Sequence, residues 1–274
     1  MKLIIDCGST KADYAVRHGA EIVGKGTVTG MNPALCTDAA IRCFFGQMAG
    51  LGPFDEVEYY GAGCLPGEVE HRVKAGAMAA LNCASVSAAS DMLGAAKALL
   101  GNRPGIAAIL GTGSNSCLYD GSRIVDNVPS LGYVLGDEGS GNHMGRTLLT
   151  RYFKRRLSSE LAEAFHLAYP DLDIPEVVRR VYRSDAPNAW LAGFARFLSD
   201  HIDKADACEI VEECLRAFVR NALAGYGSVG KTMPVGFVGS VAAAFAPQLS
   251  AVLALEGYTL GRILSRPIEG LAAE

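Results

Sequence analysis

No stretch of the 274-residue sequence comes near the roughly 18 to 20 apolar residues that a membrane-spanning helix needs. The start, Met1 to Asp6, has three consecutive apolar residues after its lysine, too few for a secretory signal peptide. A basic excess is also missing, because 25 lysines and arginines face 29 aspartates and glutamates and leave a net charge of −4. Proteins that bind the phosphate backbone usually carry such an excess. We therefore expect a soluble cytoplasmic protein that binds neither membranes nor nucleic acid.

Several catalytic and metal-binding signatures are missing as well. The eight cysteines contain no C-x-x-C spacing and are most simply reduced cysteines of a cytosolic protein. The five histidines show no H-x-x-x-H or Cys/His grouping, so no zinc site is indicated. Without a G-x-S-x-G segment, an α/β-hydrolase is disfavoured. Half of the residues are hydrophobic and 20% are charged, which indicates a globular protein with one large domain or two of modest size.

The first half of the chain alternates between strand and helix patterns. β-branched and alternating runs predict strands at residues 2–6, 12–17, 21–28, 56–60 and 84–88. Apolar residues at helical spacing predict helices at residues 34–48, 66–81 and 91–100. The cluster from Gly101 to Pro104 ends the last helical pattern and predicts a domain boundary.

The second half begins in the same order. Strands are expected at residues 105–110, 116–119, 123–127 and, as the last strand, 235–238. Helices are expected at residues 140–169, 174–182, 189–202, 205–224 and 241–253. Both halves thus read strand, glycine turn, strand, turn, strand, then helix, strand, helix, which predicts two related α/β lobes with a cleft between them. We expect an N-terminal lobe at 1–103 and a C-terminal lobe with a helical insertion at 104–263, and leave open whether 264–274 joins the first lobe.

Two glycine turns occupy equivalent places in the two halves. The first, Asp6 to Lys11, offers backbone N–H groups, two hydroxyls and an ammonium group to an anion. Asp6 at the strand end could hold Mg²⁺ through water. The second turn, Ile109 to Ser116, repeats the device. Either turn alone could be an ordinary β-turn, but two at equivalent places favour a polyphosphate held from both sides.

A third glycine motif, Gly225 to Thr232, matches the P-loop pattern G-x-x-x-x-G-K-[ST]. A P-loop needs a strand before the motif and a helix after it. Here a helix precedes it and a short strand follows. We therefore expect these glycines to end the helix and turn the chain.

The two turns and four further segments resemble the BadF/BadG/BcrA/BcrD-type ATPase family and, within it, the bacterial N-acetylglucosamine kinase branch of the actin/Hsp70/sugar-kinase superfamily. The segments are Thr29 to Pro33, Ala89 to Asp91, Gly136 to Gly141 and Val238 to Val241. The resemblance runs from Asp6 to Leu271, with the motifs in family order. It implies a two-lobed α/β protein of the actin-like ATPase fold, a duplicated ribonuclease H-like fold that binds Mg²⁺ and ATP between its lobes.

The resemblance also implies roles for single residues. ATP would be bound by Gly8, Ser9, Thr10 and Lys11 of the first turn, Thr112 and Gly113 of the second, and Gly239 and Ser240 of the adenosine motif. The sugar would be bound by Asn32, Asp137 and Glu138, and the catalytic base would be Asp91. The chain departs from its relatives at Tyr133, where they commonly have tryptophan, and this departure bears on sugar preference.

Each polar residue of the proposed sugar site also has a structural interpretation. Asp91 stands where an N-cap is favoured, and Asn32 beside a proline could start a turn. Asp137 and Glu138 between glycines could form a solvated turn before a helix. A hydroxyl that attacks a γ-phosphate needs a base, positive charge and a metal, and the resemblance gives Asp91 the role of base.

The expected function is transfer of the γ-phosphate of ATP to a hydroxyl of an amino sugar, most simply the 6-hydroxyl of N-acetylglucosamine. A homodimer is left open. One alternative is an activator ATPase for a dehydratase, which needs cysteines placed for an iron–sulfur cluster, whereas the cysteines here are scattered. Another is a catalytically silent sugar sensor, which often carries a DNA-binding segment; we expect none because the chain starts at its first phosphate strand.

Overall fold

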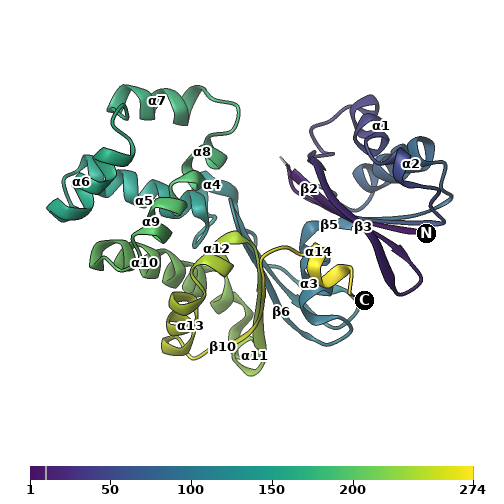
Figure 1. Ribbon diagram of the computed structural model, residues 1–274. Coiled ribbons are helices and arrows are strands. Elements are labelled where there is room, and N and C mark those ends of the chain that lie inside the picture. The colour runs from purple at the N-terminus through teal and green to yellow at the C-terminus, as the bar shows by residue number, and fades with distance from the viewer. Residues whose placement is uncertain (10, 274) are drawn as a thin grey trace. The chain divides into compact units, whose positions relative to one another are not determined.

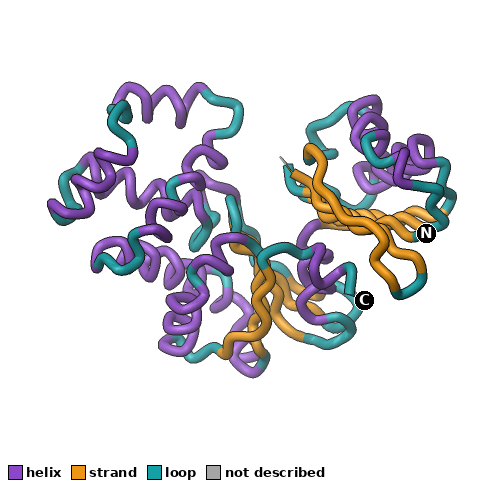
Figure 2. The backbone as a smooth tube through the Cα atoms, in the orientation of Figure 1, coloured by secondary structure: helices purple, strands orange, loops and turns teal. Residues whose placement is uncertain are grey.

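The computed structural model describes residues 1–9 and 11–273, which form two compact units (Figure 1). Unit 1 consists of residues 1–103, 120–124 and 266–274, and unit 2 consists of residues 104–119 and 125–265. Each unit contains one five-stranded sheet with helices packed against it. The strands are orange in Figure 2.

In unit 1 the strand order is β3-β2-β1-β4-β5. The strands are β1 (Lys2–Cys7), β2 (Lys11–His18), β3 (Glu21–Thr29), β4 (Glu56–Gly61) and β5 (Ser85–Ser90). The helices are α1 (Asp38–Gly46), α2 (Glu68–Leu81), α3 (Asp91–Leu100) and α14 (Ile268–Leu271). Alternate residues of β1 and β4 face opposite sides of the sheet. Leu3, Ile5 and Tyr59 pack in one core with α1, while the next residue, Tyr60, meets Gly94 of α3.

In unit 2 the strand order is β10-β9-β6-β7-β8. The strands are β6 (Gly105–Leu110), β7 (Ser114–Tyr119), β8 (Ile124–Asp126), β9 (Pro234–Val238) and β10 (Thr259–Leu264). The helices are α4 (Gly132–Leu135), α5 (Gly141–Phe153), α6 (Ser159–Ala168), α7 (Ile174–Arg183), α8 (Pro187–Gly193), α9 (Ala195–Asp200), α10 (Ala205–Asn221), α11 (Gly227–Thr232), α12 (Ser240–Ala244) and α13 (Ala246–Leu255).

The two sheets follow one plan. In unit 1, β1 pairs with β2 in antiparallel and with β4 in parallel. In unit 2, β6 pairs with β7 in antiparallel and with β9 in parallel. The duplicated order of elements that the sequence predicts is therefore present as two mixed five-stranded sheets.

Some elements differ from the predictions. The helix expected at 140–169 is two helices, because Arg155 adopts a φ of 54° and Ser158 caps a new helix by accepting a hydrogen bond from the Leu161 N–H. Strand β10 and helix α14 lie beyond the last strand and helix that the sequence predicted. Within the described part of the chain, none of the helices combines the length and apolarity needed to cross a bilayer.

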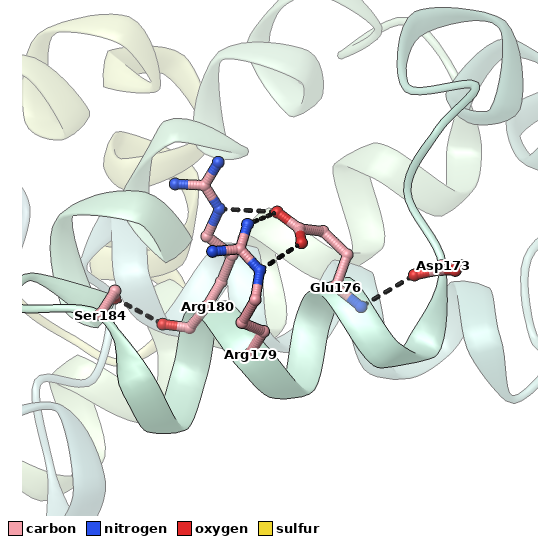
Figure 3. A network of polar contacts seen from close by, with 5 residues as sticks. All are labelled: Asp173, Glu176, Arg179, Arg180 and Ser184. Carbon is pink, nitrogen blue, oxygen red and sulfur yellow. Dashed lines mark hydrogen bonds and ion pairs between the residues drawn. The ribbon is translucent and has the colours of Figure 1, made fainter.

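Helix α7 shows how local sequence sets an element that packs little. Asp173 caps it by accepting from the Glu176 N–H at 2.8 Å, and Pro175 stands in its first turn. Glu176 then accepts from Arg179 and Arg180 one turn later, at 2.6 and 2.8 Å (Figure 3). Each such pair, one turn apart, stabilises a helix by a few tenths of a kcal/mol.

Candidate active site

One edge of the unit 1 sheet gathers most of the predicted site residues of that unit. Strands β1, β4 and β5 are parallel, and β3 points the same way because β2 is antiparallel to both β1 and β3. Their carboxyl ends therefore share an edge, the usual place for ligands in such sheets. Asp6, Asn32 and Asp91 all lie at or just beyond these ends.

The first glycine turn joins β1 to β2 and is closed by a hydrogen bond from the Gly8 N–H to the Lys11 carbonyl, at 2.9 Å. Gly30 lies directly against it: a Cβ at residue 30 would sit 2.1 Å from the Gly8 oxygen and 2.5 Å from the Lys11 nitrogen. Glycine is therefore required at position 30 for the strands to close around the turn. Ser9 is exposed at its tip, and Thr10 lies outside the described residues.

Three carboxylates influence one another at this edge. Burial raises the pKa of Asp6 to about 7, and the negative charges of Asp13 and Asp91 add to the effect. Asp13 accepts from the Thr27 hydroxyl at 2.7 Å and lies 3.1 Å from the ammonium group of Lys11. The ionised form of Asp6 is thus disfavoured, and a cation beside the carboxylate would favour it again.

Asp6 fits the role of a magnesium ligand in one specific way. In residues 1–9 and 11–273, no three His, Cys, Asp or Glu side chains converge on a common metal position. Mg²⁺ commonly keeps several waters and takes only one or two carboxylates. A single buried carboxylate with a raised pKa, beside a glycine turn, is compatible with that pattern.

Asp91 is the first residue of α3 and is not its cap. Ser90 caps the helix instead, by accepting from the Leu93 N–H at 3.3 Å. The interpretation of Asp91 as an N-cap is therefore wrong. One carboxylate oxygen of Asp91 accepts from the Met92 N–H at 2.9 Å. Burial raises the pKa of Asp91 in spite of that bond.

Asn32 is oriented by its own backbone. Its Oδ1 accepts from the Ala34 N–H at 3.1 Å, so the predicted turn is present. Because a backbone N–H can bond only to the oxygen, the Nδ2 group, which is a donor, must point the other way. Gly63, with a φ of 75°, makes room for this amide: a Cβ there would lie 2.1 Å from Oδ1.

Arg72 of α2 holds the loop that follows Asn32. Its guanidinium donates to Asp38 at 2.6 Å and to the carbonyls of Pro33 and Cys36 at 3.4 and 2.5 Å. Such a fork of donors fixes both ends of a short loop. No motif in the sequence predicts this contact, because Arg72 lies on a helix whose pattern is otherwise ordinary.

In unit 2, the turn of residues 111–114 is held from behind by α5. The carbonyls of Gly111 and Thr112 accept from the N–H groups of Gly141 and Asn142, at 2.8 and 3.2 Å. In a trans peptide the N–H points opposite to the carbonyl of the same unit. The N–H groups of Thr112 and Gly113 therefore point away from α5, side by side, in an arrangement suited to an anion.

The predicted acidic pair separates. The Asp137 carboxylate is 7% exposed and accepts from the Ser114 N–H at 3.2 Å and from Asn142 Nδ2 at 3.0 Å. Burial raises its pKa, although both hydrogen bonds favour the charged form. The neighbouring Glu138 accepts from Asn221 Nδ2 of α10 at 2.9 Å. The two adjacent carboxylates thus contact different parts of unit 2, and each has a hydrogen-bond partner in the protein.

The adenosine-type motif lies beside a cavity within unit 2. Gly239 has a φ of 123°, and a Cβ there would lie 2.2 Å from the Leu110 oxygen, so only glycine lets β9 and β6 end so close together. Ser240, Thr112 and Phe245 line a cavity of about 420 Å³. Small side chains form its other wall: Ala189, Ala192, Gly193, Ala195 and Ala244, with Arg196 and Ser199. Its volume suits a nucleoside.

The wall of this cavity and Asn142 are not among the site residues that the sequence predicts. One available signal was the pair Gly141 and Gly145, which share a face of α5. A Cβ at Gly145 would lie 1.9 Å from the Leu191 oxygen, so these glycines let α8 pack against α5 and line the cavity. The P-loop-like segment takes no such part: Gly227–Thr232 is the helix α11, followed by β9, and its Lys231 ammonium lies over the Tyr258 ring at 5.5 Å.

No family model and no curated protein matches the sequence. The structure matches a protein of Porphyromonas gingivalis described as a putative N-acetylglucosamine kinase, with 38% identity, a TM-score of 0.91, and coverage of 99% of this chain and 97% of that chain. A protein of the same description from Chromobacterium violaceum matches with 20% identity, a TM-score of 0.69 and coverage of 100% and 98%.

A more distant match is a ROK family glucokinase from Streptomyces griseus, solved in complex with glucose and AMPPNP. Its identity is 15%, its TM-score is 0.60, and coverage is 99% of this chain and 96% of that chain. This match shows a shared fold.

Proposed function

The chain belongs to the bacterial N-acetylglucosamine kinase-like family of the actin-like sugar-kinase superfamily, and on that premise we propose that it is an ATP-dependent amino-sugar kinase. The predicted actin-like fold is confirmed. The acceptor we propose is N-acetylglucosamine, phosphorylated on its 6-hydroxyl. The description of the 38%-identical Porphyromonas gingivalis protein as a putative N-acetylglucosamine kinase supports this choice of sugar.

The observation that carries the proposal is the equivalence of the two glycine turns. One joins β1 to β2 and the other joins β6 to β7, at the same place in two sheets of the same plan. Gly8, Ser9 and Lys11 of the first turn, and the paired N–H groups of Thr112 and Gly113 in the second, are the donors we assign to the phosphates. The cavity beside Gly239 and Ser240 is the site we assign to adenosine.

In the proposed reaction Asp91 accepts the proton of the attacking hydroxyl. The hydroxyl oxygen forms a bond to the γ-phosphorus while the bond from that phosphorus to the bridging oxygen breaks, and ADP leaves. Asn32 Nδ2 donates to an oxygen of the sugar, and Glu138 accepts from a hydroxyl. Asp6 would hold Mg²⁺ through water, and the bound ion would neutralise charge on the phosphoryl oxygens.

The test is sugar-dependent ADP release with Mg²⁺ and ATP, using N-acetylglucosamine, glucosamine, N-acetylmuramic acid and glucose as acceptors. We expect turnover with an amino sugar, and a fall of about a thousandfold or more in Asp91→Asn, which cannot take up the proton. Asp203→Asn removes an exposed carboxylate and serves as the control. Full activity in Asp91→Asn would reject the base. Binding of ATP and sugar without turnover would favour the sensor, and iron in anaerobically purified protein would favour the activator.

A further inference from the structure

Several hydrogen bonds with Asn142 and Asp137 hold the turn of residues 111–114 on the side that faces α5. Asn142 Nδ2 donates to the Thr112 carbonyl at 2.7 Å and to the Asp137 carboxylate at 3.0 Å. The same carbonyl also accepts from the Asn142 N–H at 3.2 Å. Asp137 in turn accepts from the Ser114 N–H at 3.2 Å. Two buried side chains therefore hold successive peptide units of the turn.

Asn142 keeps this arrangement at a cost. Its side chain is fully buried, and within the described residues its Oδ1 has no hydrogen-bond partner. Rotating the amide would put the oxygen against the Thr112 carbonyl, so the orientation is set by the two donor bonds. A buried unpaired oxygen that persists in a fold indicates a constraint beyond stability.

Asp137 is pressed against the same turn. It adopts a φ of 55°, which non-glycine residues rarely take, and this places its carboxylate beside Gly113. A Cβ at residue 113 would lie 3.0 Å from both carboxylate oxygens. The glycine in the turn thus allows the close approach of the acid, and the acid holds the Ser114 N–H.

We propose that Asp137 and Asn142 are positioning residues for the phosphate chain of the nucleotide: they fix the turn so that the N–H groups of Thr112 and Gly113 point together. This inference rests on the proposed function, and it moves Asp137 from the sugar to the phosphates. The acid and the amide act from the side of the turn opposite to those N–H groups.

The experiment compares the affinities of ATP and adenosine by calorimetry, so that the ratio of their Kd values isolates the contribution of the phosphates. We expect Asn142→Ala and Asp137→Asn to weaken ATP binding by about tenfold or more, while adenosine binding stays within twofold. Asn127→Ala is the matched control. Asn127 also donates from Nδ2 to a carbonyl, that of Ser116, and to a side-chain oxygen, that of Asn115, but makes no hydrogen bond to residues 111–114.

Two further readouts separate this role from the alternatives. Hydrogen exchange of the Ser114 amide should accelerate in both variants, and the KM for the sugar should not change. A higher sugar KM in Asp137→Asn with an unchanged ATP-to-adenosine ratio would overturn the inference in favour of a sugar contact. Equal loss of ATP and adenosine affinity would also overturn it, since that indicates general damage. Asp137→Asn conserves shape and provides the test if Asn142→Ala does not fold.

The same titration separates the two proposals. If the wild-type protein binds ATP and the variants keep the same ratio of ATP to adenosine Kd values, only the inference about Asp137 and Asn142 is overturned. Wild-type protein that binds no adenine nucleotide would overturn the proposed kinase function, and this inference with it.

Discussion

Replacing Asp6 by asparagine should stabilise unit 1 in a pH-dependent way. The pKa of Asp6 rises from its ordinary 3.8 to about 7 on folding, chiefly through burial. Between these two pH values the folded state binds more protons than the unfolded state, so stability falls as pH rises through this window. Above pH 7 the full cost applies, and three pKa units at 1.4 kcal/mol each give about 4 kcal/mol. Asparagine carries no charge and avoids this cost.

The assay is urea unfolding of metal-free protein at several pH values. Hydrogen exchange of the β1 and β2 amides, which belong to unit 1, then reports the stability of that unit. At pH 8.5, Asp6→Asn should exceed wild type in free energy of unfolding by up to about 4 kcal/mol, and by less than about 1 kcal/mol at pH 4. Asp55→Asn is the control of opposite sign: the N-terminal ammonium group lowers the pKa of Asp55, so its loss should not stabilise.

Two results would refute this reasoning. One is an Asp6→Asn variant no more stable than wild type at pH 8.5. The other is a gain that is the same at pH 4 and pH 8.5, since a gain from relieving charge must shrink as the pH falls toward the unfolded pKa of 3.8. Added Mg²⁺ should narrow the difference by stabilising the wild type, which tests the assignment of the ion to this carboxylate.

Two further substitutions test the sugar loop and the first turn. Asn32→Asp keeps an acceptor for the Ala34 N–H but loses the Nδ2 donor. The KM for the sugar should therefore rise about tenfold or more, while the melting temperature changes little. An unchanged KM would remove Asn32 from the sugar site. Gly30→Ala would place a Cβ 2.1 Å from the Gly8 oxygen and should lower the free energy of unfolding by more than about 2 kcal/mol. Gly46→Ala in α1 meets open space and should raise the free energy of unfolding by about 0.5–1 kcal/mol. Similar melting curves for the two variants would contradict the packing argument.

The parts of the fold that sequence predicts well are those set by local physics. Helix α3 begins at Asp91 and ends at Leu100 as its pattern predicts, because apolar spacing and a following Gly101 act over a few residues. The break at Arg155 is different. No glycine or proline marks it, and the left-handed backbone there is held by a carbonyl of the preceding helix, since the Arg155 N–H donates to the Tyr152 oxygen at 2.9 Å.

The site shows the same division. The glycine turns are visible in the sequence because close approach of backbones demands glycine, as at Gly239. Asn142 and Arg72 are not visible, because their roles depend on long-range contacts: Asn142 reaches Thr112 across 30 residues, and Arg72 reaches Cys36 across 36. The sequence marks Asp137 as a candidate site residue, but its contact with the Ser114 N–H, on which the role we propose depends, is visible only in the structure.

Unit 1 is built from three separate segments of the chain, and this constrains the order in which it can fold during translation. Helix α14 lies so close to α3 that a Cβ at Gly270 would be 2.2 Å from the Ala98 oxygen. A nascent chain emerging from the ribosome can thread β1 to β5 early, but the α3 surface stays uncovered until residues 268–271 leave the exit tunnel. Unit 2, whose segments end at Ser265, is by then entirely translated. The first unit to begin folding is thus the last to be completed.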